Sequence, residues 1–180
     1  MASYEEAIDV ILRHEGYFAD DPKDPGGATQ YGISLRFIKN LGLDIDMDGD
    51  VDPDDIKAIT ISRAIELYHT FFWYPGNFDQ IECQDAATKL FDCAVNMGPL
   101  QATKLACRVL IIPVPDPIKT PFEQINKMRC EDFVYHMCIQ MTDFYVALVQ
   151  RKPDLRRFLK GWMDRAKWPF RTRELLKGVA

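Results

Sequence analysis

Residues 14–34 read His14-Glu-Gly-Tyr-Phe-Ala-Asp-Asp-Pro-Lys-Asp-Pro-Gly-Gly-Ala-Thr-Gln-Tyr-Gly-Ile-Ser34. A carboxylate, a turn rich in proline and glycine, and a short run of strand-forming residues follow one another within this stretch. Just upstream, residues 4–15 carry apolar side chains at helical spacing, which predicts an amphipathic helix that ends at Gly16. The turn and the run after it predict a small β-hairpin near residues 20–34. The sequence therefore predicts a helix that leads directly into a hairpin.

Most of the remaining chain shows the apolar periodicity of α-helices, interrupted by proline and glycine. The predicted helices cover residues 35–41, 53–73, 85–97, 101–111, 122–150, 154–166 and 171–177. Residues 113–121 contain four prolines and are predicted to form a loop. The chain has 180 residues, of which 47% are hydrophobic, so it is long enough to bury a core. We therefore predict a mainly α protein with one small β element.

The formal net charge of −5 is unevenly distributed along the chain. Residues 151–180 contain ten basic and three acidic residues, a net charge of +7, which leaves −12 for residues 1–150. A basic tail that also carries aromatic side chains suits an anionic polymer. Because no nucleic-acid-binding motif is present and the rest of the chain repels phosphate, we expect no nucleic acid partner.

The sequence contains no apolar run that approaches the roughly 18 residues of a membrane-spanning helix. Its N-terminus also lacks the basic and apolar regions of a signal peptide. We therefore expect synthesis in the cytoplasm and no transmembrane segment.

Five cysteines, an odd number without a CxxC pair, indicate neither a zinc site nor a complete disulfide framework. Buried free thiols are the favoured interpretation. The cysteines are Cys83, Cys93, Cys107, Cys130 and Cys138.

Glu15 stands at the end of the first predicted helix, four residues after Ile11 and seven after Ile8. This spacing places its carboxylate on the same helix face as the apolar side chains. The end of the helix is also the negative end of the helix dipole. Both effects disfavour the ionised form, and a carboxyl group that keeps its proton is what a general acid needs. Glu15 is thus a candidate catalytic acid, and a surface residue at a helix end is the alternative.

Asp24 in the turn and Thr29 at the start of the predicted strand would face Glu15 if the hairpin folds back over the helix end. Two carboxylates across a cleft suit the hydrolysis of a glycosidic bond. One protonates the leaving oxygen, and the other positions water or stabilises positive charge on the sugar. Asp24 is the candidate second carboxylate and Thr29 would help to hold the water. Asp24 also suits a purely structural role, because aspartate is common in turns.

Residues 44–55 contain seven aspartates and fit the loop of an EF-hand. Gly49 stands at the sixth position, where the loop turns sharply, and Asp55 stands at the twelfth, where EF-hands usually have glutamate. We expect a structural Ca²⁺ site here and no cofactor for catalysis; a sensor role and a solvated acidic loop are the alternatives. The expected ligands are Asp44, Asp46, Asp48, Asp50 and Asp55.

The stretch of residues 14–34 resembles the opening of glycoside hydrolase family 108, a family of phage endolysins and bacterial muramidases in the lysozyme superfamily. The residues that match in register are Glu15, Asp24, Gly26-Gly27, Thr29 and Gly32-Ile33. Tyr17 and Phe18 depart from the pattern, where the family usually has Gly and Tyr. Further matches are Ala64, Tyr68, Trp73, the run Phe91-Asp-Cys-Ala-Val-Asn-Met-Gly98, Tyr145, Phe158, Gly161-Trp162 and Arg165-Ala166.

This resemblance implies a lysozyme-like α+β fold, with a catalytic part over residues 1–90 and a helical peptidoglycan-binding part over residues 91–180. It implies an N-acetylmuramidase that cleaves the β-1,4 bond between N-acetylmuramic acid and N-acetylglucosamine, with Glu15 as the general acid. Four residues are candidates for contacts with the glycan, although core packing is an alternative for the aromatic Trp73 and Tyr74, and a helix tie for Asn96. The four are Tyr31, Trp73, Tyr74 and Asn96.

The biological setting that the resemblance implies is an endolysin, or a muramidase that serves toxin or protein secretion. We expect a monomer whose partner is peptidoglycan, reached in the periplasm or cell wall after release through a holin or a secretion channel. Three other functions stay open. The chain could be a non-catalytic peptidoglycan-binding or secretion-assisting protein, a lytic transglycosylase, or a Ca²⁺-responsive interaction protein.

Overall fold

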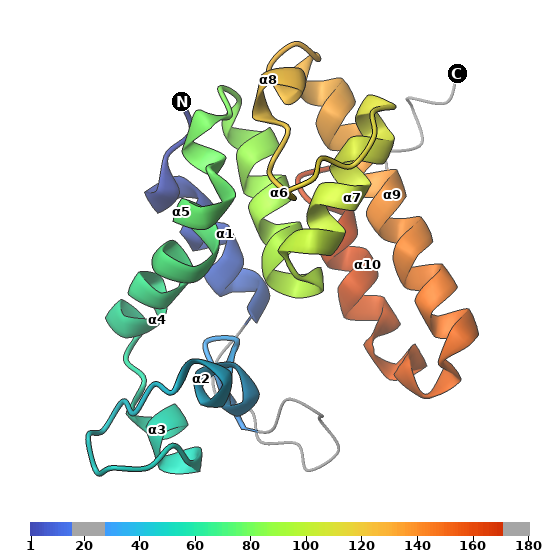
Figure 1. Ribbon diagram of the computed structural model, residues 1–180. Helices are drawn as coiled ribbons and strands as arrows, with labels where there is room; N and C mark the ends of the chain where they lie inside the picture. The colour runs from blue at the N-terminus through green and yellow to red at the C-terminus, as the bar shows by residue number, and fades with distance from the viewer. Residues whose placement is uncertain (16–27, 171–180) are drawn as a thin grey trace. The chain divides into compact units, whose positions relative to one another are not determined.

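A computed structural model describes residues 1–15 and 28–170 of the chain, and these are mainly helical with a small two-stranded antiparallel sheet (Figure 1). They divide into two compact units, one of residues 8–71 and one of residues 1–7 together with residues from 72 onward. Residues 72–90 belong to the same compact unit as the later helices, and the division into a catalytic part over residues 1–90 and a peptidoglycan-binding part over residues 91–180 stays a prediction. The predicted helix over 171–177 lies outside the described residues.

The unit of residues 8–71 contains the predicted hairpin and the helices around it. Strands β1 and β2 pair through Thr29 with Ser34 and through Gln30 with Ile33. The bounds of its elements are α1 Tyr4–Glu15, which begins in the other unit, β1 Thr29–Gln30, β2 Ile33–Ser34, α2 Leu35–Leu41, α3 Pro53–Ala58 and α4 Ile61–Tyr68. The prediction of a helix that precedes a small β-hairpin is therefore confirmed.

The helix predicted over residues 53–73 is divided in the structure. Ile59 adopts an extended conformation after α3, and Thr60 starts α4 as its N-cap. The Thr60 hydroxyl accepts a hydrogen bond from the backbone N–H of Arg63. This cap stabilises the start of a new helix at residue 61, so the two helices are not continuous. After α4 the chain continues in a π-helical segment, η1 His69–Trp73.

The second unit is a group of helices around the long helix α9, which packs against α6, α7 and α10 (Figure 1). The bounds are α5 Tyr74–Gly76, η2 Phe78–Gln80, α6 Gln84–Met97, α7 Pro99–Leu110, α8 Phe122–Ile125, α9 Cys130–Arg151, η3 Pro153–Phe158 and α10 Leu159–Lys167. The loop predicted over residues 113–121 is confirmed.

The helix predicted over residues 122–150 is interrupted between α8 and α9. The side chain of Asn126 accepts a hydrogen bond from the N–H of Glu82 and donates one to the carbonyl oxygen of Gln80, both at 2.9 Å. These two hydrogen bonds link the segment between α8 and α9 to the residues that precede α6. Their stabilisation favours a turn at this point over a continuous helix.

The cysteines correct one expectation from the sequence. Cys83 and Cys130 form a disulfide, because the start of α6 and the start of α9 lie side by side, with the two Cα atoms 6.0 Å apart. The two cysteines are 47 residues apart in the sequence, and their spacing did not indicate that they would pair. Cys93, Cys107 and Cys138 are buried free thiols, as the sequence predicted.

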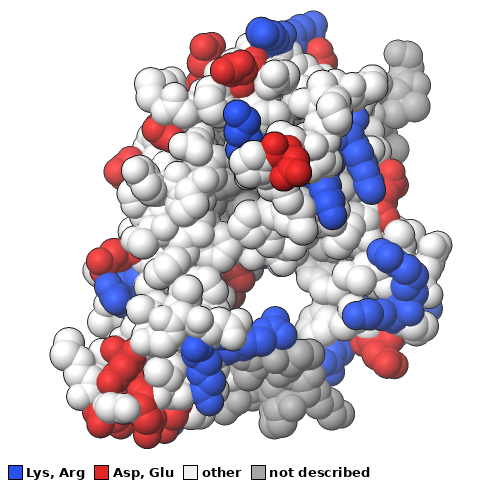
Figure 2. Space-filling view, in the orientation of Figure 1, with Lys and Arg blue, Asp and Glu red and all other residues white. Residues whose placement is uncertain are grey.

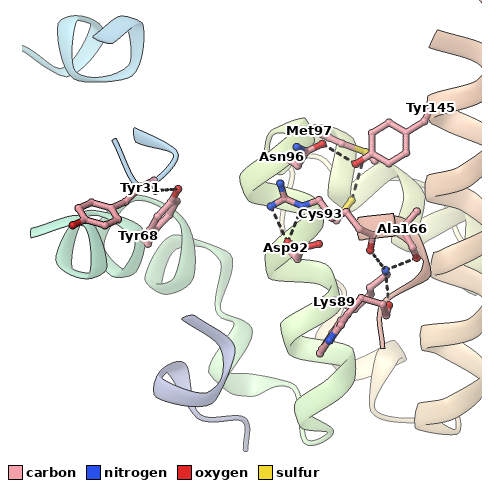
Figure 3. Close-up of polar contacts among 11 residues, drawn as sticks. Tyr31, Tyr68, Lys89, Asp92, Cys93, Asn96, Met97, Tyr145 and Ala166 are labelled. Carbon is pink, nitrogen blue, oxygen red and sulfur yellow. Dashed lines mark hydrogen bonds and ion pairs between the residues drawn. The ribbon is translucent and has the colours of Figure 1, made fainter. Parts of the chain in front are cut away.

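A buried polar cluster joins α6 to the end of α10 (Figure 3). The ammonium group of Lys89 donates hydrogen bonds to the carbonyl oxygens of Arg165, Ala166 and Trp168, at 3.1, 2.6 and 2.7 Å. One turn further along α6, Asp92 forms an ion pair with Arg165 at 2.8 Å. Burial disfavours the charged form and lowers the pKa of Lys89, and the three carbonyl oxygens are acceptors that offset the cost of burying this group.

Candidate functional site

Glu15 is the last residue of α1 and is half-buried. Ile8 and Ile11 lie in the core, so the helix face that leads to Glu15 is the buried one. The expectation that Glu15 lies on the apolar face of its helix is therefore consistent with the packing of α1.

The hairpin turn lies against the side chain of Glu15. A β-carbon built at Gly32 would lie 2.6 Å from Cγ and 2.7 Å from Cβ of Glu15, which is closer than two carbon atoms pack. Gly32 also has a φ of +78°, and Tyr31 before it has a φ of +49°. Two successive residues with positive φ match a two-residue hairpin turn of the type that favours glycine. Glycine at position 32 thus satisfies both the turn and the close approach of Glu15.

Tyr68 of α4 completes this arrangement. Its side chain is buried, and its hydroxyl donates a hydrogen bond of 2.9 Å to the carbonyl oxygen of Tyr31 (Figure 3). The same hydroxyl lies 2.5 Å from a β-carbon built at Gly32. Tyr68, the Tyr31–Gly32 peptide and Glu15 therefore meet at one point of the unit formed by residues 8–71. Tyr68 matches the family pattern in the sequence but was not among the predicted site residues.

The other site residues that the sequence predicted in this part of the chain are Thr29, Tyr31 and Asp24. Thr29 lies in β1 and is half-buried, and Tyr31 lies in the turn and is half-buried. The backbone of Tyr31 is the acceptor for Tyr68. Asp24, together with Gly16, Tyr17 and Phe18, lies outside the described residues.

The acidic loop of residues 44–55 directly precedes α3, and Figure 2 shows a cluster of carboxylates over this part of the unit of residues 8–71. Asp55 is buried, and its carboxylate accepts hydrogen bonds from the backbone N–H groups of Ile45, Asp46 and Asp52. Asp44 accepts from the N–H groups of Met47 and Gly49. The loop is thus closed by carboxylate-to-backbone hydrogen bonds between its two ends.

The ionisation of the loop carboxylates reflects their crowding. Burial and the neighbouring Asp48 raise the pKa of Asp46, and Asp48 together with burial raises the pKa of Asp50. Burial opposes ionisation of Asp55, but the three backbone N–H groups outweigh it and lower the pKa of this residue. The local repulsion is of the kind that a bound cation relieves.

Carboxylate oxygens fall into two groups of three that are compact enough to hold a metal ion, with the ligand atoms of each group within 4.8 Å of one another. One group is Asp44, Asp46 and Asp48; the other is Asp50, Asp52 and Asp55. An all-oxygen donor set of this kind fits Ca²⁺. Asp52 was not among the ligands that the sequence predicted.

The aromatic candidates Trp73 and Tyr74 differ in exposure. Trp73 is 3% exposed and packs against Tyr4, Phe78 and Phe91, so protein side chains cover its ring. Trp73 therefore lies in the core, where a sugar cannot reach its ring. Core packing was the alternative role for this residue in the sequence. Tyr74 is 73% exposed.

Asn96, on α6, is exposed, and its side-chain oxygen accepts a hydrogen bond of 2.7 Å from the hydroxyl of Tyr145 on α9 (Figure 3). Tyr145 in turn stacks on Trp162 of α10. Asn96 therefore ties two helices together, which is one of the two roles considered for it.

Comparison with known proteins adds three findings. The family model described as glycosyl hydrolase 108 matches residues 8–98. The solved structure of Brucella abortus SagA is similar over 98% of this chain and 93% of that chain, with a TM-score of 0.74 and 23% sequence identity. No curated protein matches the chain. The likeness to SagA confirms the lysozyme-like α+β fold that the sequence predicted.

Proposed function

Because the chain belongs to glycosyl hydrolase family 108, we propose that it is an N-acetylmuramidase with Glu15 as its general acid. The family supports a glycosidase of the peptidoglycan-hydrolase kind. The bond that we propose it cleaves is the β-1,4 bond between N-acetylmuramic acid and N-acetylglucosamine. The observation that carries the assignment to Glu15 is its position at the end of a buried helix face, with the hairpin turn packed against its side chain.

In this proposal Glu15 donates its proton to the glycosidic oxygen as the bond to the sugar breaks. Asp24 acts as the second carboxylate, which positions water or stabilises positive charge on the sugar, and Thr29 helps to hold that water. The packing of the turn against Glu15 supports this role, because a general acid is effective only when it is held within reach of its substrate.

Glycan contacts are proposed for Tyr31 in the hairpin turn and for the exposed Tyr74. We also propose that the acidic loop holds one structural Ca²⁺ through Asp44, Asp46, Asp48, Asp50 and Asp55. The ion would neutralise the crowded carboxylates and stabilise the loop that precedes α3 in the sequence. Catalysis by Glu15 would need no cofactor.

The partner of the enzyme would be peptidoglycan, which it would reach as a monomer in the periplasm or cell wall. Release through a holin would make it an endolysin, and release through a secretion channel would assign it to toxin or protein secretion. Within residues 1–15 and 28–170, no helix is both long and apolar enough to cross a membrane.

The test is the digestion of purified peptidoglycan by the wild type and by Glu15→Gln, with mass spectrometry of the products. Glu15→Gln keeps the size of the side chain but removes its transferable proton, so we expect product release to fall about 10²- to 10⁴-fold. Glu6→Gln is the matched control, because it makes the same change on an exposed position of the same helix. A folded Glu15→Gln protein with wild-type product release would contradict the proposal.

The products distinguish the other functions that the family likeness leaves open. Fragments with reducing ends identify a muramidase, whereas anhydro-muramic ends identify a lytic transglycosylase. Binding to peptidoglycan without any release identifies a non-catalytic binding protein.

A further inference from the structure

The hydroxyl of Tyr68 is a polar group on the buried face of α4. The neighbouring Ala64 and Leu67 are also buried, and the face as a whole packs into the core of residues 8–71. A buried hydroxyl is stabilised only where it finds a partner, and Tyr68 finds the carbonyl oxygen of Tyr31, at 2.9 Å. The partner lies 37 residues away in sequence, in the hairpin turn.

The hydrogen bond acts on the least favourable peptide of that turn. Tyr31 has a φ of +49°, a left-handed conformation that is unfavourable for a residue with a side chain. The carbonyl group that Tyr68 binds belongs to the peptide between Tyr31 and Gly32. Tyr68 therefore supports the conformation of the turn from outside it.

The same turn is in contact with the proposed general acid. The β-carbon position of Gly32 lies 2.5 Å from the Tyr68 hydroxyl oxygen and 2.6 Å from Cγ of Glu15. The side chains of Tyr68 and Glu15 thus both limit the space beside Gly32. A displacement of the Tyr31–Gly32 peptide by even a few tenths of an ångström changes the space that is available to the Glu15 side chain.

We propose that Tyr68 is a positioning residue for Glu15: its hydroxyl fixes the Tyr31–Gly32 peptide against the aliphatic part of Glu15 and so holds the carboxyl group in the orientation for proton transfer. The proposal rests on the proposed function of Glu15. Tyr68 acts through the turn, so its loss affects the chemical step more than the binding of substrate.

The experiment compares Tyr68→Phe with Thr60→Ala. Tyr68→Phe keeps the ring in the core and removes only the hydroxyl. Thr60→Ala removes a hydrogen-bonding hydroxyl from the start of the same helix, where it caps Arg63. Both variants lose one hydrogen bond that helps to stabilise α4 or its packing, but only Tyr68→Phe releases the turn.

We expect Tyr68→Phe to lower kcat on solubilised peptidoglycan fragments by about tenfold or more, with KM within twofold of the wild type. We expect Thr60→Ala to keep kcat within twofold. The amide resonance of Gly32 in ¹⁵N–¹H spectra should shift in Tyr68→Phe and stay in place in Thr60→Ala. The resonance reports the turn directly and does not depend on activity.

A wild-type kcat in folded Tyr68→Phe would overturn the proposal, as would an equal loss of kcat in Thr60→Ala. An unmoved Gly32 resonance in Tyr68→Phe would overturn it whether or not the protein is active. If Tyr68→Phe does not fold, Gly32→Ala tests the same turn, and unchanged kcat in that variant would also be contradictory. Failure of the proposed function has a separate signature: equal product release by wild type and Glu15→Gln.

Discussion

Replacing Arg165 by methionine tests whether the buried ion pair with Asp92 is a main determinant of stability in the unit formed by residues 1–7 and the residues from 72 onward. Asp92 is fully buried and Arg165 is 7% exposed, with a separation of 2.8 Å between the charged groups. Without the guanidinium, the buried carboxylate of Asp92 loses a charged partner that offsets its desolvation. The expected loss in the free energy of unfolding is about 3–5 kcal/mol, the range for a buried pair broken on one side.

The control is Arg129→Met, which removes an ion pair of similar geometry from the surface. Arg129 lies 3.1 Å from Asp132, but the two side chains are 75% and 48% exposed, so this change should cost less than about 1 kcal/mol. Urea unfolding followed by tryptophan fluorescence measures both, because all three tryptophans of the chain belong to this unit. The double variant Asp92→Leu with Arg165→Met should recover most of the loss. A cost below about 1 kcal/mol for Arg165→Met alone would refute this reasoning.

Two further predictions concern the disulfide and the acidic loop. The disulfide between Cys83 and Cys130 closes a segment of 47 residues, so Cys83→Ser with Cys130→Ser should lower the free energy of unfolding by about 4 kcal/mol, measured in urea. An unchanged stability of this double variant would contradict the prediction. Burial raises the pKa of the Cys93 thiol to about 12, so this thiol should not exchange with the disulfide. Addition of Ca²⁺ should raise the melting temperature of the wild type with little change in helix content, and Asp44→Asn with Asp48→Asn should abolish the rise. Equal melting temperatures of the wild type with Ca²⁺ and with a chelator would exclude a Ca²⁺ site that contributes to stability.

The sequence is sufficient to predict structure that arises from neighbouring residues. The apolar periodicity of residues 4–15 and the turn residues after them specify a helix followed by a hairpin, and both are present. The sequence is not sufficient where a helix is interrupted because a side chain forms a hydrogen bond with a backbone group. Thr60 and Asn126 interrupt predicted helices because their side chains form hydrogen bonds with backbone groups, and apolar periodicity alone does not reveal that competition.

Buried charges show a second limit of prediction from sequence. Residues 86–94 of α6 are all buried, and Lys89 and Asp92 lie among them, a pattern that indicates satisfied buried charges. The partners, however, lie 73 to 79 residues away at the end of α10. The same holds for the disulfide, whose two cysteines meet only because two helix starts lie side by side. Such pairings follow from the packing of helices, which the local pattern does not encode.

Part of the candidate site consists of residues that lie close together in the sequence. Glu15, the Tyr31–Gly32 turn and Tyr68 all belong to the compact unit of residues 8–71. Glu15 and Tyr31 are only 16 positions apart in the sequence, so helix periodicity and turn chemistry together bring them into one prediction. Tyr68 comes from a later helix, and its hydroxyl is recognisable only once that helix is packed against the hairpin. The proposed general acid is thus a prediction from a local motif, whereas the proposed positioning residue is recognised only in the folded unit.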